Sequence, residues 1–166
     1  MANCAVESTT LTGDFRVSEP IESNHWVNLV DEPISLLEWQ AALEDPDVGA
    51  HGWFLGVTRR TTEDRITETL SYQAHRTMAL KELEKLAVEA IKKFSLVRLV
   101  IVHRLGEVPV GEASVVVGCS SAHRVDTFDA LRWIMEVLKR DVPIWKQETY
   151  AGGSTQWVHP ETDRKA

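Results

Sequence analysis

The chain has 166 residues, of which 43% are hydrophobic and 26% charged, and its formal net charge at pH 7 is −7. This composition is ordinary for a globular protein, the length suits one domain that buries about 70% of the surface exposed by its unfolded form, and no apolar run approaches the roughly 20 residues of a membrane helix. The acidic balance argues against non-specific nucleic-acid binding, so an anionic ligand needs a local basic pocket.

The N-terminal segment has no targeting pattern. Residues 1–24 carry four acidic side chains against one arginine and lack an apolar block, unlike a secretory signal or a basic transit peptide. We expect a flexible tail over residues 1–24, one domain over residues 25–158 and a second tail over residues 159–166. Cys4 and Cys119 are the only cysteines, which predicts no disulfide framework and favours the cytosol.

The first predicted helix lies in the segment PISLLEWQAALEDP. Ser35 suits its N-cap, and Glu38 three residues later completes a capping box. Ile34 and Trp39 have the spacing of a hydrophobic staple. The helix must stop before Pro46, because the residue before a proline disfavours helical backbone.

Two predicted strands and a long helix follow. The segments GWFLGVT at 52–58 and ITETLSY at 66–72 read as strands, with the polar RRTTEDR as the loop between them. Over residues 78–94, apolar side chains recur at helical spacing. Lys92 and Lys93 fall in the last turn of this helix, where the helix dipole favours cations.

The last third of the chain predicts two more strands, a third helix and an extended segment. LVRLVIVH and ASVVVGC flank the turn-forming RLGEVPVGE, so they should pair as antiparallel neighbours. The third helix begins at Asp126 and ends near Arg140, because Pro143 cannot continue it. Residues 142–150 then read as extended. This order of strands and helices indicates a single α+β domain.

Several familiar catalytic motifs are missing from the sequence. It has no GxxxxGK[ST] phosphate loop, no HExxH, no CxxC and no GxSxG. A metal site is disfavoured, because it would need four distant histidines to converge. These are His51, His75, His103 and His123. Cys119 lies in an apolar strand with no second cysteine nearby, so a buried small residue explains it better than a sulfur-carrying nucleophile.

Basic and imidazole side chains gather where the predicted elements end, which is where ligand sites collect. They are Arg59, Arg60, His103, Arg104, His123, Arg124, Lys139 and Lys146. Arg59 and Arg124 can each offer a planar pair of donors to a phosphate or carboxylate, which a lysine cannot. Each side chain alone is compatible with a solvated surface charge. Together, in an acidic chain, they predict an anion pocket.

Lys139 and Lys146 stand close together in LKRDVPIWKQET. One alternative is that Lys139 only caps the helix C-terminus and that Lys146 is a solvated strand residue. Pro143 and Trp145 favour the other alternative, a rigid turn that returns the strand toward the helix end and brings both amines to one ligand. Lysines held beside other cations can serve as general acids, bases or transient nucleophiles.

Five stretches of the sequence resemble the large, catalytic subunit of molybdopterin synthase, the MoaE family. They are GAHGWFLGVTR, LSYQAHRTMA, HRLGEVPVGE, SSAHR and LKRDVPIWKQE, followed by Trp157 and Val158. The resemblance implies an α/β hammerhead fold of the α+β class, with an antiparallel sheet and about three helices.

The resemblance also implies an activity and a partner. Family members form a dimer of large subunits, and each binds a small ubiquitin-like subunit, giving a heterotetramer. The C-terminal Gly-Gly thiocarboxylate of the small subunit supplies sulfur to cyclic pyranopterin monophosphate, which becomes molybdopterin. We therefore expect a cytosolic sulfurtransferase with no metal, no cofactor, no nucleic-acid partner and no membrane partner.

Site residues follow from the same motifs. The resemblance implies Lys139 and Lys146 as the catalytic pair. The phosphate or pterin would be bound by Arg59, His123 and Arg124. The pocket would be lined or ordered by Phe54, Met135 and Glu148.

The sequence departs from the family's pattern at Gln73 and His75, and no lysine or arginine follows Val158 before Arg164. The competing class is a non-catalytic adaptor or pterin-binding scaffold that recognises a ubiquitin-like tail with the same basic pocket. The presence of both lysines and of the His123–Arg124 pair favours the enzyme.

Overall fold

The computed structural model describes residues 24–62 and 64–158, and its main element is a four-stranded sheet. The strands follow the order β1-β5-β7-β2. Their bounds are β1 His25–Val30, β2 Ala50–Val57, β5 Arg98–Arg104 and β7 Ala113–Ser121. The antiparallel pairing expected between β5 and β7 is confirmed, but β1 runs parallel to β5, so the sheet is mixed.

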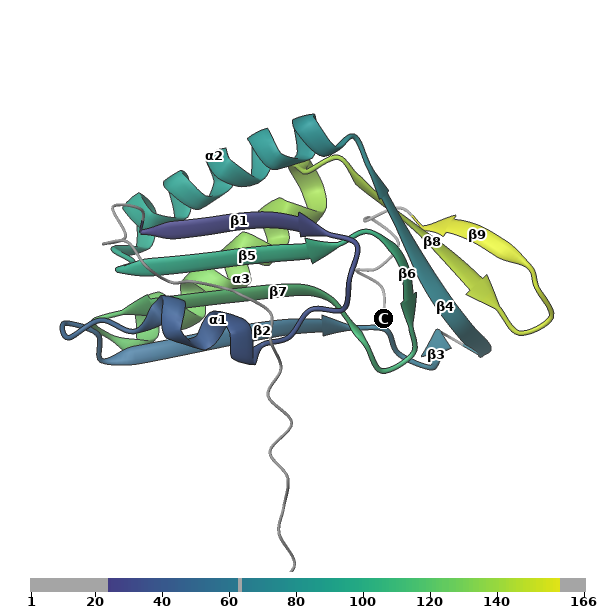
Figure 1. Ribbon diagram of the computed structural model, residues 1–166, viewed down its shortest axis with the longest axis horizontal. Helices are drawn as coiled ribbons and strands as arrows, with labels where there is room; N and C mark the ends of the chain where they lie inside the picture. The colour runs from purple at the N-terminus through teal and green to yellow at the C-terminus, as the bar shows by residue number, and fades with distance from the viewer. Residues whose placement is uncertain (1–23, 63, 159–166) are drawn as a thin grey trace, which may run out of the picture.

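A second sheet lies across one end of the first (Figure 1). It follows the order β3-β4-β8-β9. Strand β6 also pairs with β4, on the edge opposite β8. The bounds are β3 Thr61–Thr62, β4 Arg65–Ala74, β6 Gly106–Pro109, β8 Ile144–Tyr150 and β9 Thr155–Val158. The predicted α+β class is therefore confirmed, with the strands divided between two sheets.

Two long helices cover one face of the four-stranded sheet, α2 over Arg76–Phe94 and α3 over Arg124–Asp141. Their apolar stripes and the facing side chains of the sheet form the main core. Leu83, Ile101 and Ile134 in this core are fully buried. Each such side chain contributes about 1.5–3 kcal/mol relative to an exposed one. The core holds α3 at a fixed position above the sheet.

A glycine allows α3 to approach the sheet closely. At Gly52 in β2, an added Cβ would lie 2.3 Å from Cγ2 of Thr127 and 2.9 Å from Cδ1 of Leu131. Real Cβ atoms do not come so near other atoms, so any larger residue would push α3 outward. The glycine sets how far the helix stands from β2.

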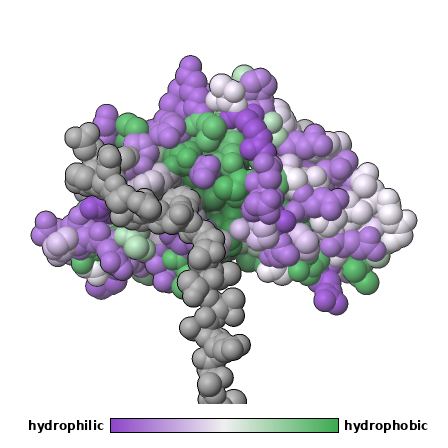
Figure 2. All heavy atoms as spheres, in the orientation of Figure 1, coloured by the Kyte–Doolittle hydropathy of each residue, from purple (hydrophilic) through white to green (hydrophobic). Residues whose placement is uncertain are grey.

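The opposite face of the sheet carries a smaller core, formed by Leu43, Val100 and Val102. Ile34 and Trp39 both pack against it. Because the N-cap of the first helix falls on Leu36 and not on Ser35, the two residues do not hold the positions of the predicted hydrophobic staple. Figure 2 shows apolar side chains gathered over the middle of this face and hydrophilic ones around them.

The first predicted helix is shorter than its sequence pattern indicates. It consists of α1, Leu37–Gln40, and the 3₁₀ turn η1, Ala41–Leu43. The N-cap position falls on Leu36 without a side-chain capping bond, so the capping box predicted at Ser35 is wrong. Burial of Leu43 ties the segment to the sheet, and this tertiary contact decides its length.

Other boundaries differ by small amounts. Helix α2 begins at Arg76 because the His75 side chain, at the N-cap, accepts a hydrogen bond from the Met78 N–H at 3.4 Å. Helix α3 begins two residues before Asp126. Strands β3 and β6 lie in segments expected to be loops, and β9 was not predicted. These short strands depend on pairing with β4 and β8, which no local pattern reveals.

Among the described residues, no helix combines the length and the apolar character needed to cross a bilayer. The tails predicted at residues 1–24 and 159–166 lie, apart from Asn24, outside the described residues. Cys4 and Arg164 fall in the same undescribed parts.

Candidate active site

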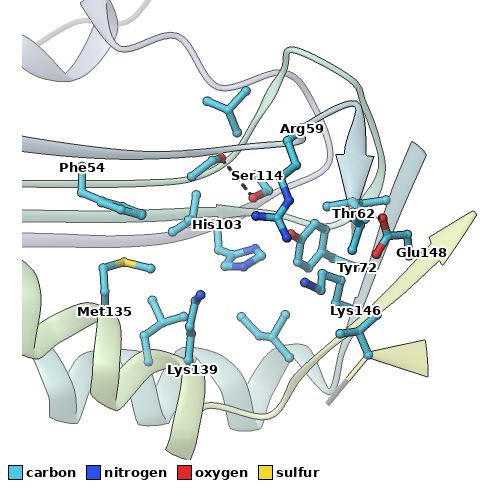
Figure 3. Close-up of a pocket in the computed structure, with 17 residues that line it drawn as sticks. Phe54, Arg59, Thr62, Tyr72, His103, Ser114, Met135, Lys139, Lys146 and Glu148 are labelled. Carbon is cyan, nitrogen blue, oxygen red and sulfur yellow. Dashed lines mark hydrogen bonds between the residues drawn. The ribbon is translucent and has the colours of Figure 1, made fainter. Parts of the chain in front are cut away.

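A pocket of about 300 Å³ lies where the second sheet meets the C-terminal end of α3. Its walls come from β2, β3, β4, β5, β7, β8, β9 and the last turns of α3 (Figure 3). It is lined by six of the eight predicted site residues: Phe54, Arg59, Met135, Lys139, Lys146 and Glu148.

The two lysines reach this pocket from adjoining elements. Lys139 stands in the last turn of α3, and Lys146 follows on β8 after the short connection through Pro143. Trp145 is 51% exposed, so the strand alternation that turns it outward turns Lys146 inward. Both ammonium groups point into the pocket (Figure 3). The predicted convergence of the two amines is confirmed.

Arg59 enters the pocket from the chain that leaves β2. The preceding Thr58 is buried, and its hydroxyl donates to the Val108 carbonyl at 3.1 Å. Its N–H donates to the Glu112 carbonyl at 3.0 Å, so the backbone beside the arginine is fixed. The guanidinium extends toward Tyr72 and the lysines (Figure 3).

The wall opposite the cationic groups is apolar. Phe54 on β2 and Met135 on α3 lie together at one end of the pocket (Figure 3). A flat aromatic ring and a flexible thioether suit contact with a planar heterocycle. One end of the pocket is therefore fitted to a ring and the rest to charge.

Glu148 is a buried carboxylate, with only 2% of the residue exposed. Its Oε1 accepts a hydrogen bond from the Thr62 hydroxyl at 2.7 Å and a second from the Thr67 hydroxyl. The two hydroxyls are themselves 3.2 Å apart. Burying a carboxylate without such donors is costly, so these threonines are what allow Glu148 to stand beside the pocket.

His103 also lines the pocket, but it is not the cation that the basic set predicted. The residue is 4% exposed, and burial lowers its pKa to about 4. Its Nδ1 donates to the Arg104 carbonyl at 2.8 Å, and its ring meets the Tyr72 ring edge-on with 4.9 Å between centroids. At neutral pH it is an uncharged imidazole.

Two further members of the basic set contribute nothing to this pocket. The Arg104 side chain forms an ion pair with Glu112 and is only 10% exposed. Arg60 is exposed and does not line the pocket. Three further residues line the pocket and were not predicted from the sequence: Tyr72, Thr62 and Ser114. Their types are common in ordinary strands, so only the way the sheets meet reveals them.

His123 and Arg124 lie at the other end of α3, at its N-cap and first residue. Both are exposed. Lys139 is fifteen residues farther along the helix, a separation of about 22 Å at 1.5 Å per residue. One chain therefore does not bring this pair to the pocket.

The cysteine and the other predicted histidines of the described chain do not line this pocket. Cys119 is buried, which raises its thiol pKa to about 12, and its Sγ lies 3.6 Å from the Thr127 carbonyl. The expectation of a buried small residue is confirmed. His51 and His75 are both exposed, on β2 and at the start of α2. The described residues contain no group of three or more histidine, cysteine or carboxylate side chains placed to hold a metal ion.

Together, the fold and the pocket define a small α+β protein that presents cations beside an apolar wall. The family model described as MoaE protein matches residues 29–141, and the chain belongs to this family. The family indicated by the sequence motifs is thus confirmed.

Similar proteins with names are consistent with membership of this family. The molybdopterin synthase catalytic subunit of Emericella nidulans is 44% identical over 115 residues, which cover 69% of this chain and 59% of that protein. The one from Dictyostelium discoideum is 37% identical over 139 residues, or 82% of this chain and 88% of that protein. The crystal structure of molybdopterin synthase from Staphylococcus aureus matches with a TM-score of 0.73 and 33% identity, covering 78% of this chain and 94% of that one.

Proposed function

We propose that this chain is the catalytic subunit of a molybdopterin synthase. It converts cyclic pyranopterin monophosphate to molybdopterin, with sulfur from the C-terminal thiocarboxylate of a small ubiquitin-like partner. The observation that carries the proposal is the meeting of Lys139, Lys146 and Arg59 in one pocket of a MoaE-family chain.

The charges of the pocket suit both reactants. The cyclic phosphate and the thiocarboxylate are anions, and three cationic side chains from three different segments face the space they would share. Arg59 can hold phosphate with two parallel hydrogen bonds. The two ammonium groups can stabilise charge that develops as sulfur is transferred, and such fixed donors commonly contribute two to three orders of magnitude in rate.

The sulfur must come from outside the described part of the chain. Its single cysteine, Cys119, does not line the pocket and carries a buried thiol with a raised pKa. A thiolate is the reactive form of cysteine, so this residue is a poor sulfur carrier. A partner that brings sulfur on its extended C-terminus fits this arrangement.

The substrate-binding role proposed for His123 and Arg124 requires a second copy of the chain. They lie about 22 Å along α3 from Lys139, by the helical rise of 1.5 Å per residue, so they can serve the pocket of another copy but not their own. A dimer of large subunits with a small subunit on each, a heterotetramer, is the assembly that we propose.

A turnover assay tests the proposal directly. The chain, the thiocarboxylated small partner and cyclic pyranopterin monophosphate should together yield the dithiolene product, and omission of the partner should abolish it. Removal of the partner's two terminal glycines should also abolish it. A stable complex that forms no dithiolene would instead establish the alternative, a non-catalytic adaptor or scaffold.

A further inference from the structure

We propose that His103 is a specificity-determining residue of the pocket, whose Nε2 accepts a hydrogen bond from an N–H group of the bound pterin. The inference rests on the proposed function for the identity of the ligand. It rests on the structure for a buried ring nitrogen that faces the pocket and has no hydrogen-bond partner among the described residues.

The hydrogen bond at Nδ1 determines which form the ring takes. A backbone carbonyl has no proton to give, so Nδ1, 2.8 Å from the Arg104 carbonyl, must carry the hydrogen. In a neutral imidazole the other nitrogen then has a free lone pair. The lowered pKa of His103, about 4, keeps the ring neutral at physiological pH. Nε2 is therefore an acceptor.

Nε2 also lacks a hydrogen-bond partner among the described residues. The only hydrogen bond of His103 to any residue in 24–62 or 64–158 is the one at Nδ1. A polar ring atom in a residue only 4% exposed is seldom left unpaired. The ring points into the pocket between Tyr72 and Lys139, where a ligand atom can supply the missing donor (Figure 3).

His103 Nε2 is one of few acceptors that face the pocket, beside the Glu148 carboxylate, whose Oε1 already accepts from two threonine hydroxyls. Arg59, Lys139 and Lys146 carry donors and no acceptor. The Ser114 hydroxyl gives its hydrogen to the Gly56 carbonyl at 3.1 Å and the Thr62 hydroxyl gives its hydrogen to Glu148, so these oxygens can only accept from a ligand. A pterin presents both an anionic phosphate and N–H donors on its fused rings. The cations suit the phosphate, and His103 suits one of the N–H donors.

A matched pair of variants tests the proposal. His103→Phe keeps a flat ring and removes the acceptor, and we expect it to weaken binding of cyclic pyranopterin monophosphate at least tenfold. Turnover at saturating substrate should fall by less, and inhibition by inorganic phosphate should stay within twofold, because phosphate contacts the cations. His103→Gln, whose amide oxygen can reach the position of Nε2, should restore part of the affinity. His51→Phe, outside the pocket, is the control.

An experiment on the unmutated protein removes any dependence on variant folding. Nitrogen-15 NMR of His103 should show Nε2 without a proton at pH 7, and its signal should shift as the pterin is added but not as inorganic phosphate is added. A protonated Nε2, or a signal that the pterin leaves unmoved, would overturn the inference. So would unchanged pterin affinity in a folded His103→Phe variant, even with wild-type turnover intact and the proposed function upheld.

Discussion

The two ends of helix α3 carry similar residues in different surroundings. At the C-terminal end, Lys139 meets Arg59 and Lys146 because the second sheet lies against this part of the molecule. At the N-terminal end, His123 and Arg124 are exposed, with no second layer of the described chain over them. A basic side chain thus becomes part of a pocket only where another structural layer faces it.

Buried hydrogen bonds nevertheless order the backbone at the N-terminal end of α3. The buried Ser121 hydroxyl lies 2.7 Å from the His123 carbonyl and 2.6 Å from the Thr127 hydroxyl. These contacts hold the backbone that carries His123 and Arg124 while leaving the two side chains outward. An ordered backbone with free basic side chains is what a contribution to a neighbouring copy requires.

The largest expected effect is at the C-terminal end. Lys139→Ala and Lys146→Ala should each lower turnover by on the order of a hundredfold or more, as loss of a fixed cationic donor commonly does. Thermal stability should change little, because Lys139 is exposed and Lys146 only partly buried. Lys139→Arg should stay impaired if a proton transfer or acyl link is needed. Wild-type rates in both alanine variants would refute the catalytic assignment.

A mixing experiment compares the two ends directly. Lys139→Ala and Arg124→Ala should each be impaired alone, yet mixed dimers contain one pocket with both residues intact. Random exchange should restore about a quarter of wild-type activity, because half of the dimers are mixed and half of their pockets intact. Lys139→Ala mixed with Arg59→Ala is the matched control and should recover nothing, since both residues serve the same chain's pocket. Equal recovery in both mixtures would contradict the assembly.

His103 should make stability depend on pH. Its folded-state pKa, about 4, lies below the ordinary histidine pKa of 6.5, so the unfolded chain takes up a proton first as the pH falls. The free energy of unfolding should therefore decrease between pH 6.5 and 4, by on the order of 3 kcal/mol for a shift of this size. Urea unfolding across this range measures it. The dependence of the free energy of unfolding on pH should become weaker in His103→Phe and should persist in the exposed-site control His51→Phe.

Removal of a hydroxyl group beside Glu148 should have a smaller effect on the protein than the changes above. Thr67→Val keeps the shape and removes a donor to a buried carboxylate, which should cost about 1–3 kcal/mol of stability. Thr67→Ser retains the hydroxyl and should keep most of the stability and activity. Chemical denaturation and turnover of the two variants compare them. A loss in Thr67→Ser with none in Thr67→Val would assign the effect to the methyl group rather than to the hydrogen bond.

The smallest effect is expected at Cys119, which lies beneath the N-terminal half of α3. Cys119→Ala should leave sulfur transfer within a few fold of the parent, because the thiol contacts the Thr127 carbonyl and not the pocket. Turnover with thiocarboxylated partner is the measurement, with a thermal melt to check folding. Complete loss of activity in a folded variant would mean that this cysteine carries sulfur after all.

The sequence by itself predicted the family, the α+β class, the two long helices and six residues that meet in the pocket. The helices and strands follow from local periodicity, and the meeting of the lysine pair was expected from its short, rigid connection. The family, and the places of Phe54, Met135 and Glu148 in the pocket, followed from the resemblance of the motifs.

Tertiary structure decided the short strands, the charge state of His103 and the position of His123 and Arg124, because these features depend on what lies against each segment. Strands β6 and β9 exist only as partners of β4 and β8. His103 looked like a cation in the sequence and is neutral because the fold buries it. His123 and Arg124 belong to the same basic set, yet the length of α3 keeps them from their own chain's pocket. Charge state and proximity are properties of the surroundings, and a linear pattern does not contain them.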